Sequence, residues 1–186
     1  LSPSLDAIVL SDFVYGMITP NLLELLTDLA KKRGLLLFGD LQCSSQIGNV
    51  SKFQKFKLLC PTEREARICL RNQEDGLVVL CEKLRQQAQA SNIFLKLGTE
   101  GILLHIENDG QPQTDRIPAL NSAPQDVVGA GDSLLITSAM ALSSNAAPWE
   151  AACIGNLAAA LQVGNIGNVP IRKDQFIKSL HSFHSR

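Results

Sequence analysis

The amino-acid sequence predicts an α/β domain in which helices cover both faces of a mainly parallel sheet. Short apolar runs of strand length alternate along the chain with longer stretches of helical period. Residues that typically begin and end helices stand at the boundaries between them. The 186 residues, 45 % of them hydrophobic, suffice for one domain with a real core. We therefore expect residues 1–186 to form a single domain.

The first strand and the first helix have clear boundaries. An apolar run at residues 7–10 predicts a buried strand. A helix over residues 20–33 follows, because Thr19 is a good N-cap, Pro20 suits the first helical position and Gly34 suits the C-terminal cap. Its last turn is basic, which complements the negative end of the helix dipole.

The remaining elements follow the same alternation. The segment T-E-R-E at residues 62–65 has capping-box spacing, so a helix is expected from Glu63. Residues 42–51 are polar and predict a loop, and Asn108-Asp109-Gly110 predicts a turn in a hairpin-like excursion. We expect further strands at residues 35–38, 57–59, 93–97 and 102–106, and further helices at residues 76–90, 133–142 and 149–163 and from Ile171.

A glycine turn at residues 126–132, D-V-V-G-A-G-D, is the candidate functional site. A turn that opens a helix leaves backbone N–H groups without partners, with the positive end of the helix dipole behind them. Such a site binds anions, and the carboxylate of Asp132 would lie beside the anion. Phosphate next to a carboxylate suggests phosphoryl transfer. The same pattern is also common in helices with no function, so the motif alone does not decide.

Several polar residues follow the predicted strands. Asp12, Asp40, Thr62, Gly98 and the loop at Asp126 each come after a strand or a short apolar run. Ligands of parallel α/β sheets bind at the carboxyl ends of the strands. We therefore expect these residues to converge on one edge of the sheet.

On the basis of the glycine turn and several further segments, the chain resembles the ribokinase-like (PfkB) family of carbohydrate kinases. Within that family it is most similar to the heptose-7-phosphate kinase domain of bifunctional heptose kinase/ADP-heptose synthases. Besides D-V-V-G-A-G-D, the segments that carry the resemblance are S-D-F-V-Y-G-M-I-T-P (11–20), G-D-L-Q (39–42), C-P-T-E-R-E-A (60–66), K-L-G-T-E-G (96–101) and N-L-A-A-A-L-Q-V-G-N-I-G (156–167). The resemblance implies a three-layer α/β/α sandwich with a mainly parallel sheet, as the C-terminal part of such a kinase.

The resemblance also implies roles for individual residues. Asp132 would be the catalytic base that deprotonates the sugar hydroxyl, and backbone amides of the turn would form the anion hole for the transferring phosphoryl group. Asn156 would lie near the adenine of ATP. The residues implied for the anion hole are Gly129, Ala130, Gly131 and Asp132, and those implied for the nucleotide phosphates are Lys96, Gly98, Thr99 and Gly101.

Two metal ions are implied in addition to ATP. Glu65 would help to hold Mg²⁺ through water, since Mg²⁺ keeps much of its hydration shell. Asp126 stands where family members often hold a monovalent cation beside the anion hole. Thr62 and Glu65 also form a plain capping box, and for this pair we favour that structural interpretation.

The chain departs from the family pattern at three positions near the expected site. Tyr15 and Gln42 replace lysines, and Thr62 replaces an asparagine. The strands and lid that the family places ahead of this part are expected to be absent from residues 1–186. Without them a sheet edge would be exposed, which favours pairing with another chain, so a homodimer is one expectation.

Composition argues against several classes of partner. The net charge of −1 and the few aromatic residues predict no nucleic-acid binding, and the lack of a long apolar run or signal peptide predicts no membrane association. The cysteines number five without a C-x-x-C pair, which predicts reduced thiols in a cytoplasmic protein. His105, His181 and His184 are too scattered to predict a metal site.

Three hypotheses about function remain open at this stage. The first is ATP-dependent phosphorylation of a sugar or sugar phosphate, with a heptose-7-phosphate-like acceptor. The second is a kinase-derived module without catalysis, which binds nucleotide weakly or serves in assembly. The third is a kinase of the same family with a nucleoside or aminoimidazole acceptor.

Overall fold

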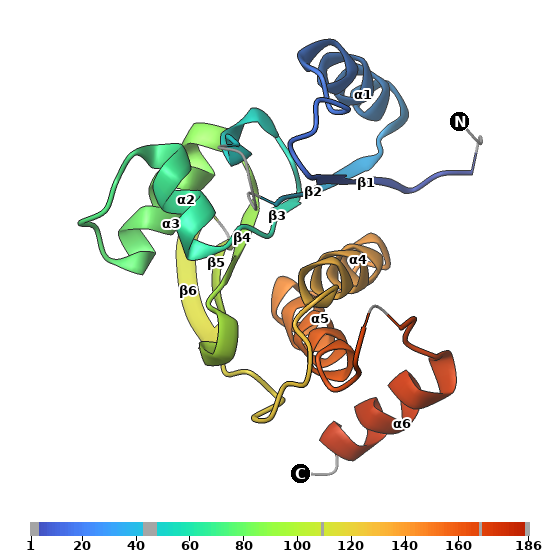
Figure 1. The fold of residues 1–186 in the computed structure, drawn as a ribbon. Coiled ribbons are helices and arrows are strands. Elements are labelled where there is room, and N and C mark those ends of the chain that lie inside the picture. The colour runs from blue at the N-terminus through green and yellow to red at the C-terminus, as the bar shows by residue number, and fades with distance from the viewer. Residues whose placement is uncertain (1–3, 43–47, 109, 168, 185–186) are drawn as a thin grey trace.

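A computed structural model describes residues 4–42, 48–108, 110–167 and 169–184 of the chain. Its centre is a six-stranded sheet in which the strands lie in sequence order (Figure 1). The first four strands are parallel and the last two are antiparallel to their neighbours. The strands are β1 (Ala7–Asp12), β2 (Leu36–Leu41), β3 (Leu58–Leu59), β4 (Asn92–Lys96), β5 (Ile102–Asn108) and β6 (Gln111–Ile117).

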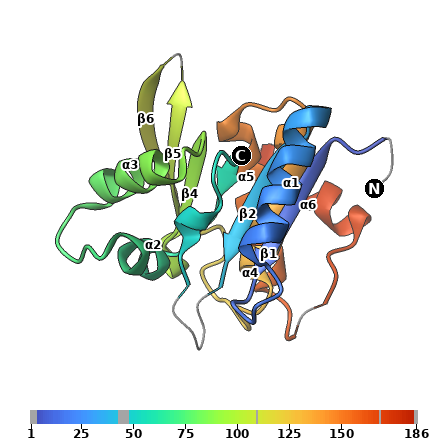
Figure 2. The same cartoon turned by 90° about the horizontal axis from the view of Figure 1, so that it is seen from above.

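Helices cover both faces of the sheet. On one face lie α1 (Pro20–Arg33), α2 (Glu63–Leu70) and α3 (Leu77–Ala88), and on the other lie α4 (Ala130–Ser143) and α5 (Pro148–Gln162) (Figures 1 and 2). The last helix, α6 (Lys173–His184), packs on α5. Single turns of 3₁₀-helix occur at η1 (Val50–Lys52) and η2 (Gly98–Glu100). The predicted three-layer, mainly parallel α/β fold is thus confirmed.

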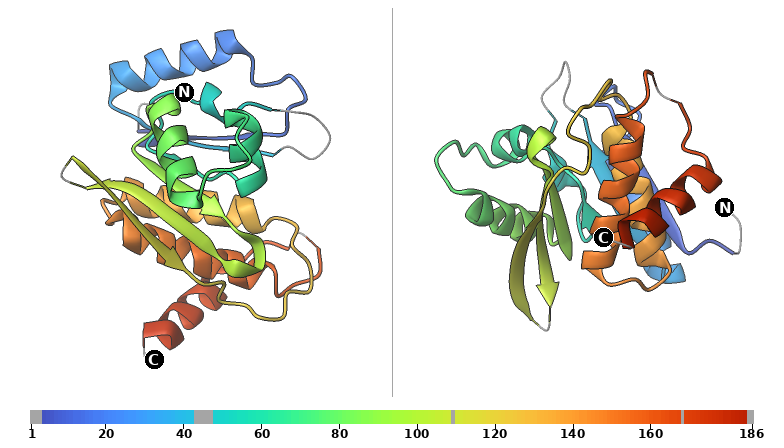
Figure 3. Two further views of the ribbon diagram at one scale, coloured as in Figure 1. Left: turned by 90° about the vertical axis from the view of Figure 1, so that its left-hand side faces the viewer. Right: turned by 90° about the horizontal axis from the view of Figure 1, so that it is seen from below.

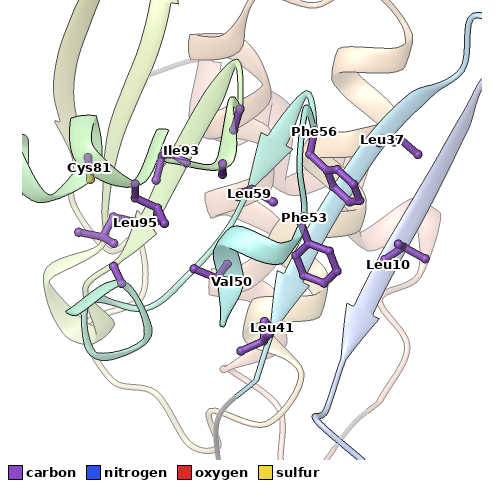
Figure 4. Packing of buried hydrophobic residues seen from close by; sticks show 14 of the residues in the cluster. Leu10, Leu37, Leu41, Val50, Phe53, Phe56, Leu59, Cys81, Ile93 and Leu95 are labelled. Carbon is purple, nitrogen blue, oxygen red and sulfur yellow. The ribbon is translucent and has the colours of Figure 1, made fainter. Parts of the chain in front are cut away.

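Two aromatic rings lie in the core between β2 and the helices α1, α2 and α3 that cover this face of the sheet. Phe53 and Phe56 are fully buried and stack with their ring centroids 5.1 Å apart (Figure 4). Gly39 makes room for them on β2, because a Cβ at this position would lie 3.0 Å from the ring of Phe56 and 3.1 Å from that of Phe53. The rings therefore lie directly on the backbone of the strand whose end carries Asp40.

The predicted helix caps are confirmed in the structure. The Thr19 hydroxyl accepts a hydrogen bond from the amide of Leu22 at 3.2 Å, and Gly34 closes α1 in the left-handed conformation with φ of 68°. Thr62 and Glu65 form the predicted capping box at the start of α2. Local sequence signals decided these boundaries because caps satisfy amides within the same few residues.

The strand β6 was not among the predicted strands. Its residues are polar and mostly exposed, so it lacks the apolar pattern of a buried strand. It pairs with β5 through its backbone and through side-chain contacts such as that between the Thr114 hydroxyl and Nδ1 of His105 at 2.6 Å. The hairpin of β5 and β6 projects beyond the rest of the sheet (Figure 3). Asp109 of the predicted turn and residues 43–47 of the predicted loop lie outside the described residues.

Within the described residues β1 pairs only with β2, so its other edge is open, as expected. The four described cysteines, Cys60, Cys69, Cys81 and Cys153, are all free thiols, and Cys43 lies outside the described residues. None of the described helices has both the length and the apolar character needed to cross a membrane.

Gly101, just before β5, lies in close contact with the backbone at the end of β6. It has φ of 93°, and a Cβ there would lie 2.1 Å from the carbonyl oxygen of Ile117. We expect Gly101→Ala to lower the free energy of unfolding by about 2–5 kcal/mol, from the positive φ together with the clash. Gly34→Ala is the control, because Gly34 has φ of 68° but open space around it, and should lose only about 1–2 kcal/mol. Equal losses in urea denaturation would contradict the assigned clash.

Candidate active site

The candidate site lies where the carboxyl ends of β1, β2 and β4 meet the start of α4. The parallel register places Ser11 beside Asp40, and Thr62 forms a parallel bridge with Lys96. Helix α4 packs across β1 and β2 from the opposite face to α1 (Figure 1). This juxtaposition arises because β1 to β4 are parallel and end at the same edge of the sheet.

The start of α4 presents two open backbone amides. Gly129 caps the helix in the left-handed conformation with φ of 79° and offers no side-chain cap. The first helical hydrogen bond runs from the Ser133 amide to the Gly129 carbonyl at 2.9 Å, and the Ala130 amide donates to the Val127 carbonyl at 3.3 Å. In the described part of the chain, the amides of Gly131 and Asp132 have no acceptor. Two amides at the positive end of a helix thus remain available to an anion.

Two side chains hold the carboxylate of Asp132 by one oxygen. The Ser11 hydroxyl donates to Oδ1 at 3.1 Å, and the Gln42 amide nitrogen donates to the same oxygen at 3.2 Å. No described residue donates to Oδ2. The glutamine that replaces a family lysine is therefore a direct partner of the predicted base, a role that sequence reasoning missed. Ser11 was missed as well, because it lies 121 residues away along the chain.

A buried ion pair lies against the same turn. The Lys96 ammonium donates to Oδ2 of Asp40 at 2.5 Å, and Asp40 is fully buried. A Cβ on Gly131 would lie 3.2 Å from the Lys96 nitrogen, so a side chain here would require the pair to shift by a few tenths of an ångström. Burial opposes the Lys96 charge, but the Asp40 carboxylate outweighs it and raises the pKa of Lys96.

A second ion pair lies one strand away. The ammonium of Lys52 donates to the carboxylate of Asp12 at the end of β1, and Asp12 is almost fully buried. Both predicted strand-end aspartates therefore have a lysine partner that the sequence did not reveal. These partners come from η1 and β4, which are distant along the chain.

The residues predicted to bind Mg²⁺ form a complete capping box. The Glu65 amide donates to the Thr62 hydroxyl at 3.2 Å, and the Thr62 amide donates to Oε2 of Glu65 at 2.7 Å. Glu65 is buried, with 6 % of its surface exposed. The described residues contain no group of three or more histidines, cysteines, aspartates or glutamates that would hold a metal. The magnesium role of Glu65 therefore stays a prediction.

Asp126 ties the glycine turn to the segment after α5. Its Oδ1 accepts the Val128 amide at 3.0 Å and its Oδ2 accepts the Gly167 amide at 3.0 Å. The Val128 hydrogen bond, followed by that from Gly167, lowers the pKa of Asp126. Asn156 makes a similar structural contact, because its amide nitrogen donates to the Pro118 carbonyl at 2.8 Å. The cation and adenine roles of these two residues stay predictions.

A hollow beside the ion pair extends toward η2. Its volume is about 710 Å³, and it runs from the first turns of α2 to the end of β4. Gly98 has φ of 63° with open space around it, and Thr99 is exposed. The residues that line the hollow are Thr62, Glu63, Arg64, Arg67, Ile68, Gln73, Lys96, Leu97 and Gly98.

Many α/β proteins that bind phosphorylated ligands share this arrangement. In them, open amides at the start of a helix lie above the carboxyl edge of a parallel sheet. Comparison with known families makes the assignment specific. Residues 3–173 match the pfkB family carbohydrate kinases, so the chain belongs to this family. The predicted family is thereby confirmed.

Curated relatives of the chain include bifunctional HldE proteins. The chain is 29 % identical to that of Wolinella succinogenes over 182 residues, which cover 96 % of the chain and 36 % of the relative. It is 32 % identical to that of Campylobacter fetus over 166 residues, which cover 88 % of the chain and 34 % of the relative. The chain thus spans about a third of the length of these relatives.

Solved structures share the fold. Phosphofructokinase-2 from Escherichia coli, in complex with potassium, aligns with a TM-score of 0.77 at 20 % identity, over 96 % of this chain and 57 % of that one. Ribokinase from Thermotoga maritima aligns with a TM-score of 0.73 at 25 % identity, over 95 % of this chain and 57 % of that one. The three-layer arrangement is therefore that of the ribokinase-like kinases.

The contacts of Asp126 predict how stability depends on pH. A lowered pKa in the folded state contributes stability that is present above the ordinary value of 3.8 and is lost as pH falls through the lower folded value. The difference in free energy of unfolding between the wild type and Asp126→Asn, called the stability gap below, should therefore become smaller as pH falls from about 6 to about 3. Urea denaturation at each pH measures the gap.

The control for this experiment is Asp28→Asn. Asp28 is exposed on α1 and accepts no hydrogen bond from a described residue. Its substitution should change the free energy of unfolding by less than about 0.5 kcal/mol at either pH. A gap for Asp126→Asn that stays constant with pH would contradict the assigned role of its two amide contacts.

Proposed function

We propose that this chain is the nucleotide-binding and catalytic part of a kinase that transfers the γ-phosphoryl group of ATP to a hydroxyl of a sugar or sugar phosphate. The observation that carries the proposal is Asp132, in the first turn of α4, beside two open amides and held by Ser11 and Gln42. Membership of the pfkB carbohydrate kinases supports the class of reaction.

Asp132 is the base in this proposal. Ser11 and Gln42 both donate to Oδ1, so Oδ2 remains available to accept the proton of the acceptor hydroxyl. The two donors fix the direction of the carboxylate and keep its charge stabilised before the reaction. Geometry of this kind lets a carboxylate take a proton as the new bond forms.

The open amides are the anion hole. As the acceptor oxygen bonds to the γ-phosphorus, the bond from that phosphorus to the bridging oxygen breaks and ADP leaves. The amides of Gly131 and Asp132, at the positive end of α4, donate hydrogen bonds to the transferring group and stabilise its negative charge. Gly129 and Ala130 shape the turn that holds these amides in place.

The remaining assignments concern the nucleotide and the ions. Lys96 and Gly98 line the hollow at the end of β4, which supports placing the nucleotide phosphates there. We assign Thr99 and Gly101 of the same turn to the phosphates as well, and Asn156 to the adenine. Mg²⁺, when bound, would neutralise phosphate charge; buried Glu65 fits an outer position, reached through water, better than direct ligation. Asp126 keeps free lone pairs on both oxygens for a monovalent cation.

The acceptor is the least constrained part of the proposal. Similarity to the HldE proteins favours a heptose-7-phosphate-like acceptor. The chain spans only about a third of those relatives, so the acceptor contacts would come in large part from outside residues 1–186. The test therefore uses the full-length protein that contains this chain.

The test is ATP turnover against a panel of sugars and sugar phosphates, with Asp132→Asn as the key variant. Loss of the base should lower kcat by a factor of about 10²–10⁴, while the affinity for ATP stays near that of the wild type. Asp174→Asn is the matched control, because it makes the same change in the first turn of an exposed helix, α6, and should keep full activity.

Two outcomes would count against the proposal. A wild type that binds ATP and phosphorylates no acceptor of the panel would favour a non-catalytic module. Full activity in Asp132→Asn would leave the kinase assignment intact and remove Asp132 as the base.

A further inference from the structure

The ion pair of Asp40 and Lys96 lies beside the proposed anion hole, and the proposed reaction gives no role to Asp40 and none to the pairing itself. Asp40 is the second-last residue of β2 and Lys96 is the last of β4, so the pair crosses above the end of the two-residue strand β3. The Asp40 side chain is fully buried, and the Lys96 side chain is 15 % exposed. A buried ion pair is costly to form, so its presence at this edge calls for a specific role.

Asp40 is held rigidly by both of its carboxylate oxygens. Oδ1 accepts the amide of Leu41 at 2.9 Å, and Oδ2 accepts the ammonium of Lys96 at 2.5 Å. The backbone of Lys96 is fixed as well, because its amide donates to the Pro61 carbonyl at 2.8 Å and its strand pairs with β5. The position of the ammonium is therefore determined at both ends of the side chain.

The ammonium of Lys96 keeps unused donor capacity. A lysine ammonium has three N–H donors, and Asp40 is its one side-chain acceptor in the described part of the chain. Lys96 also lines the hollow that extends toward η2. Two donors are thus left on a charged group that borders both the hollow and the glycine turn.

The distances at Gly131 place the pair at the base of the proposed anion hole. The Lys96 nitrogen lies 3.2 Å, and Oδ2 of Asp40 lies 3.6 Å, from the position of a Cβ on Gly131. Of these two groups, the Lys96 ammonium lies nearer to Gly131. Without it, the buried carboxylate would lie next to the bound anion and repel it.

We infer that Asp40 and Lys96 act together on the phosphoryl group: Asp40 positions the ammonium of Lys96, and Lys96 donates to the phosphoryl group held by the amides of Gly131 and Asp132. This inference rests on the proposed kinase function. It makes Lys96 a contact residue for the transferring group and Asp40 a positioning residue. Because ADP lacks the transferring group, the pair should favour ATP over ADP.

The first readout is the ratio of ATP affinity to ADP affinity, measured by calorimetry without acceptor. Lys96→Met should lower this ratio about tenfold, the size of one lost charge-assisted hydrogen bond. The double variant Asp40→Asn/Lys96→Met should also give a ratio below that of the wild type, but not below that of Lys96→Met, because it removes the repelling carboxylate together with the ammonium. The double variant also leaves no unpaired buried charge, so it keeps the test possible if a single variant fails to fold.

The second readout separates positioning from binding. Asp40→Asn keeps the Lys96 side chain but removes its anchor and the carboxylate that favours its charge, so kcat should fall about tenfold while the affinity for ADP stays unchanged. A purely structural role would lower the melting temperature of the variants without changing either readout.

Lys52→Met is the matched control, because it breaks the neighbouring pair with buried Asp12, which does not border Gly131. It should lower the melting temperature and leave the ATP-to-ADP ratio unchanged. An unchanged ratio in folded Lys96→Met and in the double variant would overturn the inference while the wild-type kinase activity stands. A wild type that binds neither nucleotide would instead overturn the proposed function, and this inference with it.

Discussion

The close approach of α4 to the carboxyl edge of the sheet is the constraint on which the site depends. Gly131 lies against the buried pair of Asp40 and Lys96, and a Cβ at this position would come within 3.2 Å of the Lys96 ammonium. The approach keeps the amides of Gly131 and Asp132 over the ends of the strands. It also brings the Asp132 carboxylate within hydrogen-bond distance of Ser11 and Gln42. The position of Gly131 therefore affects the packing of α4 on the sheet, the geometry of the turn and the proposed anion hole.

The rest of the molecule stabilises that approach from both sides. The stacked rings of Phe53 and Phe56 pack on Gly39 and hold the end of β2 from the α1 face. Asp126 fastens the turn before α4 to Gly167 beyond α5. Preorganised charge and dipoles are what phosphoryl transfer requires, since the protein contributes mainly by positioning and by stabilising charge. The rigid surroundings of the turn suit that task.

Sequence patterns predicted local features far better than contacts between distant segments. The caps at Thr19 and Gly34 and the capping box of Thr62 and Glu65 were predicted because donor and acceptor lie within a few residues. The strand β6 was missed because its residues are polar and mostly exposed, so they lack the apolar pattern of a buried strand. Gln42 was interpreted as a lost charge, whereas it donates to Asp132 across 90 residues of sequence.

By itself, the sequence determined the family, the alternation of strands and helices, and the identity of the glycine turn with Asp132. These depend on local propensities, hydrophobic period and motif residues, which are all properties of short segments. Only the tertiary structure decided which oxygen of Asp132 is held, which lysines neutralise Asp12 and Asp40, and which amides stay open. Those outcomes depend on distances between β1, β2, β4 and α4, and such distances are set by packing across the whole sheet.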